Sequence, residues 1–343
     1  MSHEYRDQID IRNNEKINEL LDGMPEFVEY FYEHLVARGR STNTILGYMY
    51  EINVFLRFVQ VIAKKESVNK LDVTDLEKLK QNNIESYIAK SENGKDLSSN
   101  AKCRKLSVLK SLYTYFIGNE MISKNPTALT EGPKIKSKDV IKLTDSQVIA
   151  LLNCIRNQNG VSDHALKYNE RMVARDLAII MTLLGTGMRI SELVGLNLND
   201  IDRTDPKKIY LRIVRKGNDE DKVRVIQPVY AAITDYMVSS RPQLVGSSRE
   251  NALFISTRGT RMSVNAIQKM LEKYCEKAGL PDNISPHKMR ATFATKVYAE
   301  TKDIYAIKDA LHHSTIDTSK HYISDKEARI DSAAKAAGKL FGL

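Results

Sequence analysis

The first 130 residues carry apolar side chains at helical spacing and show no alternating strand pattern. Apolar residues that recur every three or four positions share one face of a helix and can be buried together. This spacing predicts four helices, over residues 25–38, 41–63, 73–91 and 98–117. Residues 1–24 are polar with only a weak helical pattern, and we expect a flexible arm there. The first domain, residues 25–130, is therefore predicted to be entirely helical.

Residues 131–142 form a segment that fits neither a helix nor a strand. Gly132 and Pro133 cannot continue a helix, and three lysines follow at alternate positions. We expect an exposed linker, which is either a solvated tether or a basic strap that lies along phosphate groups.

The second domain begins near residue 143 and mixes helical and strand patterns. After an apolar helix over 174–184, residues 208–214 and 222–227 alternate on either side of a turn, which predicts an antiparallel hairpin. A short strand is expected at 253–255, together with several further helices. The predicted fold class is mainly α: a helical domain followed by an α+β domain with a small antiparallel sheet.

Charge and cysteine content limit the classes of partner and compartment. The net charge of +9, from 52 basic and 43 acidic residues, fits a nucleic acid or an anionic membrane surface, or a mildly basic protein that binds neither. No apolar run approaches the ~20 residues of a membrane span, and residues 1–10 are too polar for a secretory signal. Cys103, Cys154 and Cys275 lie far apart without a CxxC pair, which predicts reduced thiols, no zinc site and a cytoplasmic location.

Several charged side chains stand in unusual places in the second domain. Arg189 directly follows an apolar helix and a Gly-Thr-Gly turn, where it either pairs with Glu192 or faces a phosphate. His287 and Arg290 are three residues apart, so on a helix they would share a face. An exposed histidine at a capped helix start is the ordinary interpretation of that pair.

Two adjacent histidines and a tyrosine follow near the C-terminus. His312 and His313 have no carboxylate or cysteine at ligand spacing, so no metal site is predicted. Tyr322, nine residues after His313, would by itself be a core or interface residue. Each of these groups alone therefore has a structural interpretation.

Their order and spacing together are similar to the tyrosine recombinase (phage integrase) family. The segments 186–193 and 287–322 carry the closest match. The resemblance implies a SAM-like core-binding domain over 25–130 and a catalytic domain over 143–325. It also implies that a C-terminal helix over 326–343 docks in a neighbouring protomer. The short arm is similar to Xer-like or Cre-like members, which lack a separate arm-binding domain.

The resemblance implies a role for each of these residues. Tyr322 is the expected nucleophile, which forms a 3′-phosphotyrosyl intermediate without metal or cofactor. Phosphodiester transfer needs stabilisation of charge on the phosphate oxygens, and two arginine forks suit that task. The expected catalytic residues are Arg189, Lys216, His287, Arg290, His313 and Tyr322, with Glu192 orienting one of them. Lys222 is the alternative to Lys216, because the turn is longer than the usual pattern. Ala291 and His312 depart from the family's usual His and Gly, which puts local packing in question.

The resemblance also implies double-stranded DNA as partner, with inverted-repeat core sites bound by a homotetramer that proceeds through a Holliday junction. The fourth helix would enter the major groove, and positions on the second helix and in the second domain would contact the backbone. The expected DNA-binding residues are Thr44, Tyr48, Lys102, Arg104, Lys105, Lys110, Arg258, Arg261, Ser263 and Lys269. These exposed charges could equally be a solvated surface.

Two other functions remain open from sequence. A type IB topoisomerase-like enzyme would use the same chemistry to relax supercoils without site preference. A DNA-binding regulator would keep the fold and lose cleavage, although Arg189, Arg290 and Tyr322 are all present.

Overall fold

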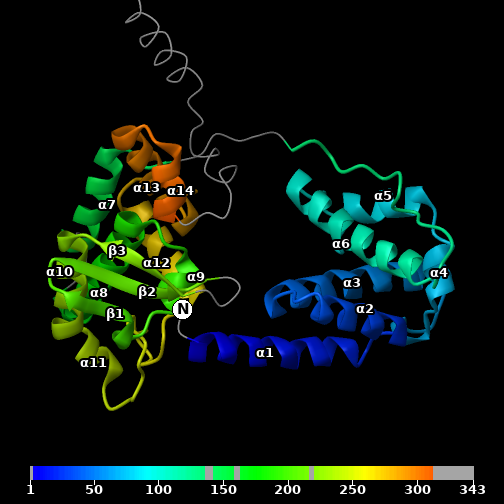
Figure 1. The fold of residues 1–343 in the computed structure, drawn as a ribbon, viewed down its shortest axis with the longest axis horizontal. Helices are drawn as coiled ribbons and strands as arrows, with labels where there is room; N and C mark the ends of the chain where they lie inside the picture. The colour runs from blue at the N-terminus through cyan, green and yellow to red at the C-terminus, as the bar shows by residue number, and fades with distance from the viewer. Residues whose placement is uncertain (1–2, 136–141, 158–162, 216–219, 312–343) are drawn as a thin grey trace, which may run out of the picture. The chain divides into compact units, whose positions relative to one another are not determined.

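The computed structural model describes residues 3–135, 142–157, 163–215 and 220–311, and it divides into two compact units. One unit comprises residues 7–137, and the other comprises residues 138–343 together with the first six residues (Figure 1). Each unit has its own hydrophobic core. We call them the helical domain and the catalytic domain, the second after the function that the sequence resemblance implies.

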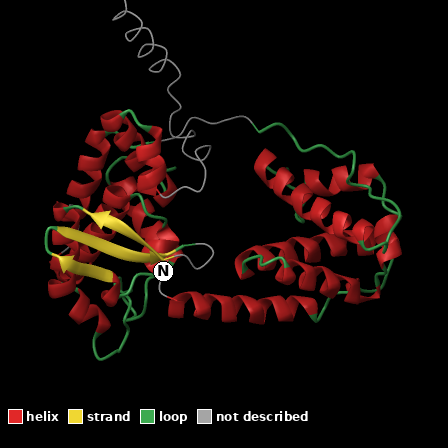
Figure 2. Ribbon diagram, viewed as in Figure 1, coloured by secondary structure: helices red, strands yellow, loops and turns green. Residues whose placement is uncertain are grey.

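The helical domain contains only helices among its described residues (Figure 2). They are α1 (His3–Leu21), α2 (Glu26–Ala37), α3 (Thr42–Ala63), the 3₁₀ turn η1 (Val68–Lys70), α4 (Val73–Glu77), α5 (Gln81–Ala89) and α6 (Ser99–Gly118). Phe55 and Tyr113 are fully buried at its centre and contact each other edge to face. The predicted all-helical domain is confirmed, and Ser98 caps α6 by accepting a hydrogen bond from the Ala101 amide (3.3 Å).

The N-terminal segment differs from the flexible arm that we expected over 1–24. It forms α1, and Ile17 and Leu21 are buried in the core of the helical domain. The Asn13 amide donates to Thr42 Oγ1 (3.1 Å) at the start of α3. The apolar edge of α1 is narrow, so its sequence is weakly amphipathic, but packing against neighbouring helices stabilises it.

The third predicted helix, residues 73–91, is two helices in the structure. Asp72 and Asp75 form a capping box that begins α4. The Asn83 side chain then accepts a hydrogen bond from the Lys80 amide (2.9 Å), which begins α5. Two helix-start signals eight residues apart therefore divide a segment whose apolar spacing is continuous.

Helix α3 is the one helix in the described part of the chain that is long and apolar enough to cross a membrane, judged by length and composition alone. Its apolar face is buried in the core of the helical domain. The core residues are Ile45, Met49, Ile52, Phe55, Leu56 and Val59. This pattern is typical of a core helix.

The catalytic domain packs one three-stranded antiparallel sheet against helices (Figures 1 and 2). Its elements are α7 (Asp145–Asn157), α8 (Asp163–Thr186), α9 (Ile190–Val194), η2 (Leu198–Asp200), β1 (Ile201–Asp205), β2 (Lys208–Val214), β3 (Glu220–Val225), α10 (Gln227–Ser239), α11 (Arg241–Val245), α12 (Val264–Lys277), α13 (Pro286–Thr301) and α14 (Ile304–Leu311). The strand order is β1-β2-β3. The predicted hairpin is confirmed as β2 and β3, and the mainly α fold class is confirmed with it.

The strand predicted at residues 253–255 is wrong. Of these residues, Ile255 makes one isolated bridge, to Arg261, and Leu253 and Phe254 make none. The Leu253 amide donates to the Leu196 carbonyl (2.8 Å), and Leu253, Phe254 and Ile255 are all buried. A short apolar run can be buried without belonging to a sheet, and periodicity does not distinguish the two cases.

Candidate active site

Arg189 is the N-cap residue of α9, directly after the turn that ends α8. The Glu192 carboxylate accepts hydrogen bonds from both the Arg189 amide (2.7 Å) and Arg189 Nη1 (2.8 Å). Glu192 is buried, whereas the Arg189 side chain is 47% exposed. The predicted ion pair with Glu192 is therefore present, and it holds an arginine whose remaining donors are open to solvent.

Gly187 forms the turn in front of Arg189 and has no room for a side chain. Its φ is +62°, and an added Cβ would lie 2.4 Å from Phe293 Cδ1 and 2.7 Å from Leu311 Cδ2. The Gly187 carbonyl also accepts a hydrogen bond from Arg290. The glycine is thus required by its positive φ and by the close approach of α13 and α14.

We expect Gly187→Ala to lower the free energy of unfolding of the catalytic domain by about 2–4 kcal/mol, because a strained φ and overpacking add. Gly279→Ala is the matched control: its φ is +63° and no atom lies within 4 Å of an added Cβ. Gly279→Ala should lower the free energy of unfolding by only about 1 kcal/mol. Urea unfolding of both variants measures the difference, and equal losses would contradict the crowding argument.

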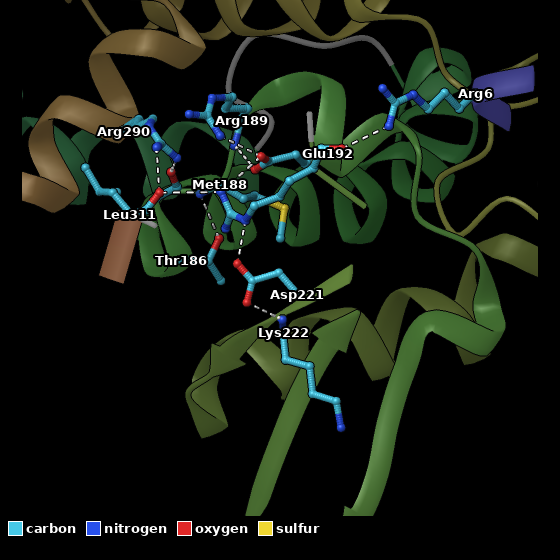
Figure 3. A network of polar contacts seen from close by, with 11 residues as sticks. Arg6, Thr186, Met188, Arg189, Glu192, Asp221, Lys222, Arg290 and Leu311 are labelled. Carbon is cyan, nitrogen blue, oxygen red and sulfur yellow. Dashed lines mark hydrogen bonds and ion pairs between the residues drawn. The ribbon is translucent and has the colours of Figure 1, made fainter. Parts of the chain in front are cut away.

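Arg290 lies on α13 and points to the same turn. Its guanidinium is buried and donates to the carbonyl oxygens of Gly187 and Leu311, the latter at 2.9 Å from Nη2. His287, three residues earlier, is exposed at the start of α13. The structure therefore brings Arg189 and Arg290 into one polar network (Figure 3).

Arg215 at the end of β2 joins this network, and the sequence did not identify it. Its Nε donates to Asp221 Oδ2 (2.5 Å), and its Nη1 lies 3.4 Å from Glu192 Oε1 and 3.5 Å from the Leu311 carbonyl. Ile209, Leu211 and Ile213 alternate inward along β2. Continued alternation places residue 215 on the same inner face, which is the signal that could have revealed it.

Lys222, the alternative catalytic lysine, lies within β3. Its ammonium is 2.9 Å from Asp202 Oδ2 on β1. Hydrogen bonds from Thr204 and Lys222 hold the pKa of the Asp202 carboxyl below its ordinary value. In Figure 3 the Lys222 side chain extends away from Arg189 and Arg290. Lys216, His313 and Tyr322 lie outside the described residues.

Ala291 and the apolar end of α13 and α14 form a small separate cluster. Ala291 is buried together with Ala294, Ile307 and Leu311. A larger side chain at residue 291 would have to displace these neighbours. The family that the chain resembles usually has a histidine at the position of residue 291. The alanine found there is instead closely packed among apolar side chains.

Three of the predicted DNA-binding residues make contacts within the protein. Lys105 is buried, with its ammonium 3.7 Å from Glu51 and 3.9 Å from the ring centre of Tyr87. Arg261 donates to the carbonyl oxygens of Val194 and Leu196 at the end of α9 (2.9 and 3.0 Å).

Ser263 is the third of these residues. It is the N-cap of α12, where its hydroxyl accepts from the Ala266 amide (3.1 Å). No local sequence pattern indicated these contacts. Lys105 is buried beside Glu51, and Arg261 donates to backbone carbonyls, so both side chains have partners within the protein.

The other predicted DNA-binding positions are at least partly accessible. Arg104, Lys110, Arg258 and Lys269 are exposed, and Thr44, Tyr48 and Lys102 are half-buried. Lys110 also lines a surface hollow of about 360 Å³ between α2 and α6. The hollow is bordered by His34, Arg38, Ser111, Thr114, Tyr115, Gly118 and Asn119. Its bordering charges are basic, which suits an anionic group.

Within the described ranges, no group of three His, Cys, Asp or Glu side chains could hold a metal ion. Arg189, Arg215 and Arg290 gather near the Gly187 turn together with the carboxylates of Glu192 and Asp221. Such an arrangement can bind and polarise a phosphate.

Comparison with known proteins identifies both domains. Residues 143–329 match the model of the phage integrase family, and residues 28–119 match the phage integrase N-terminal SAM-like domain. The tyrosine recombinase XerC of Caldanaerobacter subterraneus subsp. tengcongensis is 32% identical over 320 residues, which cover 89% of this chain and 84% of that protein. The tyrosine recombinase XerD of Staphylococcus saprophyticus subsp. saprophyticus is 28% identical over 304 residues, or 88% of this chain and 94% of that protein.

Solved structures show the same fold. The XerH site-specific recombinase in a post-cleavage complex with palindromic difH substrate is 21% identical, with a TM-score of 0.65 over 87% of this chain and 81% of that chain. The Tn1549 transposon integrase in complex with transposon right-end DNA is 19% identical, with a TM-score of 0.65 over 92% and 99%. The family match covers more than half of the chain, and the chain therefore belongs to the phage integrase family of tyrosine recombinases.

Proposed function

We propose that this tyrosine recombinase cuts duplex DNA with Tyr322 at a phosphate held by Arg189 and Arg290. The observation that carries the proposal is the convergence of both arginines on the Gly187 turn. Arg189 presents donors to solvent while a buried carboxylate holds it. A phosphodiester there would meet fixed positive charge that needs little reorganisation.

The proposed cleavage step exchanges one phosphate ester for another. The Tyr322 oxygen attacks phosphorus, the bond to the 5′ oxygen breaks, and a 3′-phosphotyrosyl ester forms. His287 accepts the tyrosine proton, and Lys216 gives a proton to the departing 5′ oxygen. His313 donates a hydrogen bond to a non-bridging oxygen. The phosphotyrosyl ester retains the energy of the phosphodiester bond that was cleaved. The 5′ hydroxyl of another strand can therefore attack it and release Tyr322 without ATP.

Lys216 is preferred to Lys222 in this proposal because of the geometry of β3. Lys222 is ion-paired with Asp202 on the sheet and points away from the two arginines (Figure 3). Lys216 directly follows Arg215, which contacts the Glu192 that holds Arg189.

We further propose that the active assembly is a homotetramer on inverted-repeat core sites, which exchanges strands through a Holliday junction. A C-terminal helix over residues 326–343 would link neighbouring protomers. The relatives named recombinases and the DNA-bound structures of similar fold support a DNA substrate. Among the described residues the three cysteines are free, which suits a reducing cytoplasm.

The exposed basic side chains of α6 should contribute to DNA affinity through phosphate neutralisation. We expect Arg104→Ala and Lys110→Ala each to reduce the slope of log K against log salt by about 1, because one counterion release is lost. Lys105→Met is the buried control: it should leave this slope unchanged and destabilise the helical domain by about 1–3 kcal/mol. Salt titrations by fluorescence anisotropy measure the slopes. If Lys105→Met alone changed the slope, Lys105 would be the phosphate contact in place of Arg104 and Lys110.

Capture of covalent complexes tests the proposed function directly. Purified protein is incubated with fragmented DNA from around its own gene, and complexes that survive denaturing detergent are sequenced. We expect adducts at one or a few sites that contain inverted repeats. Specific binding without adducts would indicate a regulator, and adducts without site preference together with supercoil relaxation would indicate topoisomerase-like activity.

A further inference from the structure

We propose that Arg215 is a positioning residue that sets the spacing of the two phosphate-binding arginines. This inference rests on the proposed function of Arg189 and Arg290. It concerns a residue for which the family resemblance implied no role.

The acceptors of Arg215 are the same groups that hold the two arginines. Glu192 Oε1 accepts from Arg189 Nη1 at 2.8 Å and lies 3.4 Å from Arg215 Nη1. The Leu311 carbonyl accepts from Arg290 Nη2 at 2.9 Å and lies 3.5 Å from the same Arg215 nitrogen. One nitrogen of Arg215 therefore bridges the acceptor of Arg189 and the acceptor of Arg290.

Arg215 is itself held in place from the hairpin. Asp221 Oδ2 accepts from its Nε at 2.5 Å, and its own carbonyl accepts from Arg6 Nη1 at 2.9 Å. The side chain of Arg215 is 12% exposed and that of Glu192 is 5% exposed. The Nε and Nη1 donors of Arg215 are both directed to acceptors within the protein, so its effect on the reaction passes through these neighbours.

The charges around Arg215 also support a positioning role. Three guanidinium groups and two carboxylates leave one net positive charge in the cluster formed by Arg189, Arg215, Arg290, Glu192 and Asp221. Arg215 supplies one of these three positive charges, and without it Glu192 would lose one of its two guanidinium contacts.

The test compares cleavage of a normal scissile phosphate with cleavage of a methylphosphonate at the same position. A methylphosphonate lacks one anionic oxygen, so it depends less on correctly placed arginines. The enzymes are the full-length protein and its Arg215→Met, Arg215→Lys and Arg189→Ala variants. Gly187→Ala serves as a variant with a structural defect in the same turn. Covalent complex formation on nicked duplexes gives single-turnover rates, and anisotropy gives DNA affinity.

We expect Arg215→Met to slow phosphate cleavage by about 10²-fold, as small displacements of catalytic groups do, with DNA affinity changed by less than about twofold. The rate ratio of phosphate to methylphosphonate should fall at least about tenfold, as for Arg189→Ala, and Arg215→Lys should restore part of it. Unchanged cleavage by Arg215→Met would overturn the inference, as would equal losses on both substrates. Undiminished phosphate cleavage by Arg189→Ala would instead refute the proposed site itself.

Discussion

Tyr322→Phe should abolish covalent complexes while leaving site-specific DNA binding intact. Phenylalanine keeps the ring and lacks the oxygen that attacks phosphorus. Removal of the nucleophile from an enzyme with a covalent intermediate reduces its rate by about 10⁶-fold, so no adduct should be detected. Detergent-resistant complexes on the mapped site measure this, and anisotropy measures the retained affinity.

Other tyrosines of the described chain provide the control. Burial raises the pKa of Tyr113 and Tyr236, the latter to about 12, so these phenols are poor nucleophiles at neutral pH. Tyr305 on α14 is 59% exposed and is the matched choice. Tyr305→Phe should cleave at the normal rate. Adducts formed by Tyr322→Phe and lost in Tyr305→Phe would move the nucleophile to α14.

Lys216→Ala should slow cleavage by about 10²–10⁴-fold, the usual contribution of a general acid. The defect should nearly disappear on DNA whose 5′ bridging oxygen is replaced by sulfur. A thiolate leaves without a proton because its pKa lies far below that of an alkoxide. Rates on the oxygen and sulfur substrates, measured in single turnover, separate proton donation from other losses.

Lys222→Ala distinguishes the two candidate lysines. The Lys222 side chain is 56% exposed in its ion pair with Asp202, so its loss should affect stability little. We expect normal cleavage of both substrates by this variant. If Lys222→Ala instead showed the sulfur-rescued defect and Lys216→Ala did not, the assignment would be exchanged.

Local patterns predicted the features that depend on neighbouring residues in the chain. The hairpin of β2 and β3 follows from alternation, and Thr144 with Gln147, three residues later, forms a capping box at α7. The pairing of Arg189 with Glu192 follows from a spacing of three residues in the first turn of a helix.

Contacts between residues that are far apart in the chain could not be predicted in this way, because a local pattern does not contain both partners. Lys105 looks like an exposed basic residue until Glu51 and Tyr87 are placed beside it. Arg261 resembles a DNA contact, although the carbonyls that bind it lie more than sixty residues earlier. The role of Arg215 required three elements to converge, which no single window of sequence contains.

The two separate cores have a consequence for how this enzyme finds its sites. Each domain has its own buried centre, so each can present a binding surface without the other. Tethering makes the second contact intramolecular, at an effective concentration that for short flexible tethers is on the order of millimolar. Two individually weak contacts can thereby give tight binding to a DNA segment that engages both domains. A site that satisfies only one domain gains no such avidity, so discrimination arises from requiring both contacts at once.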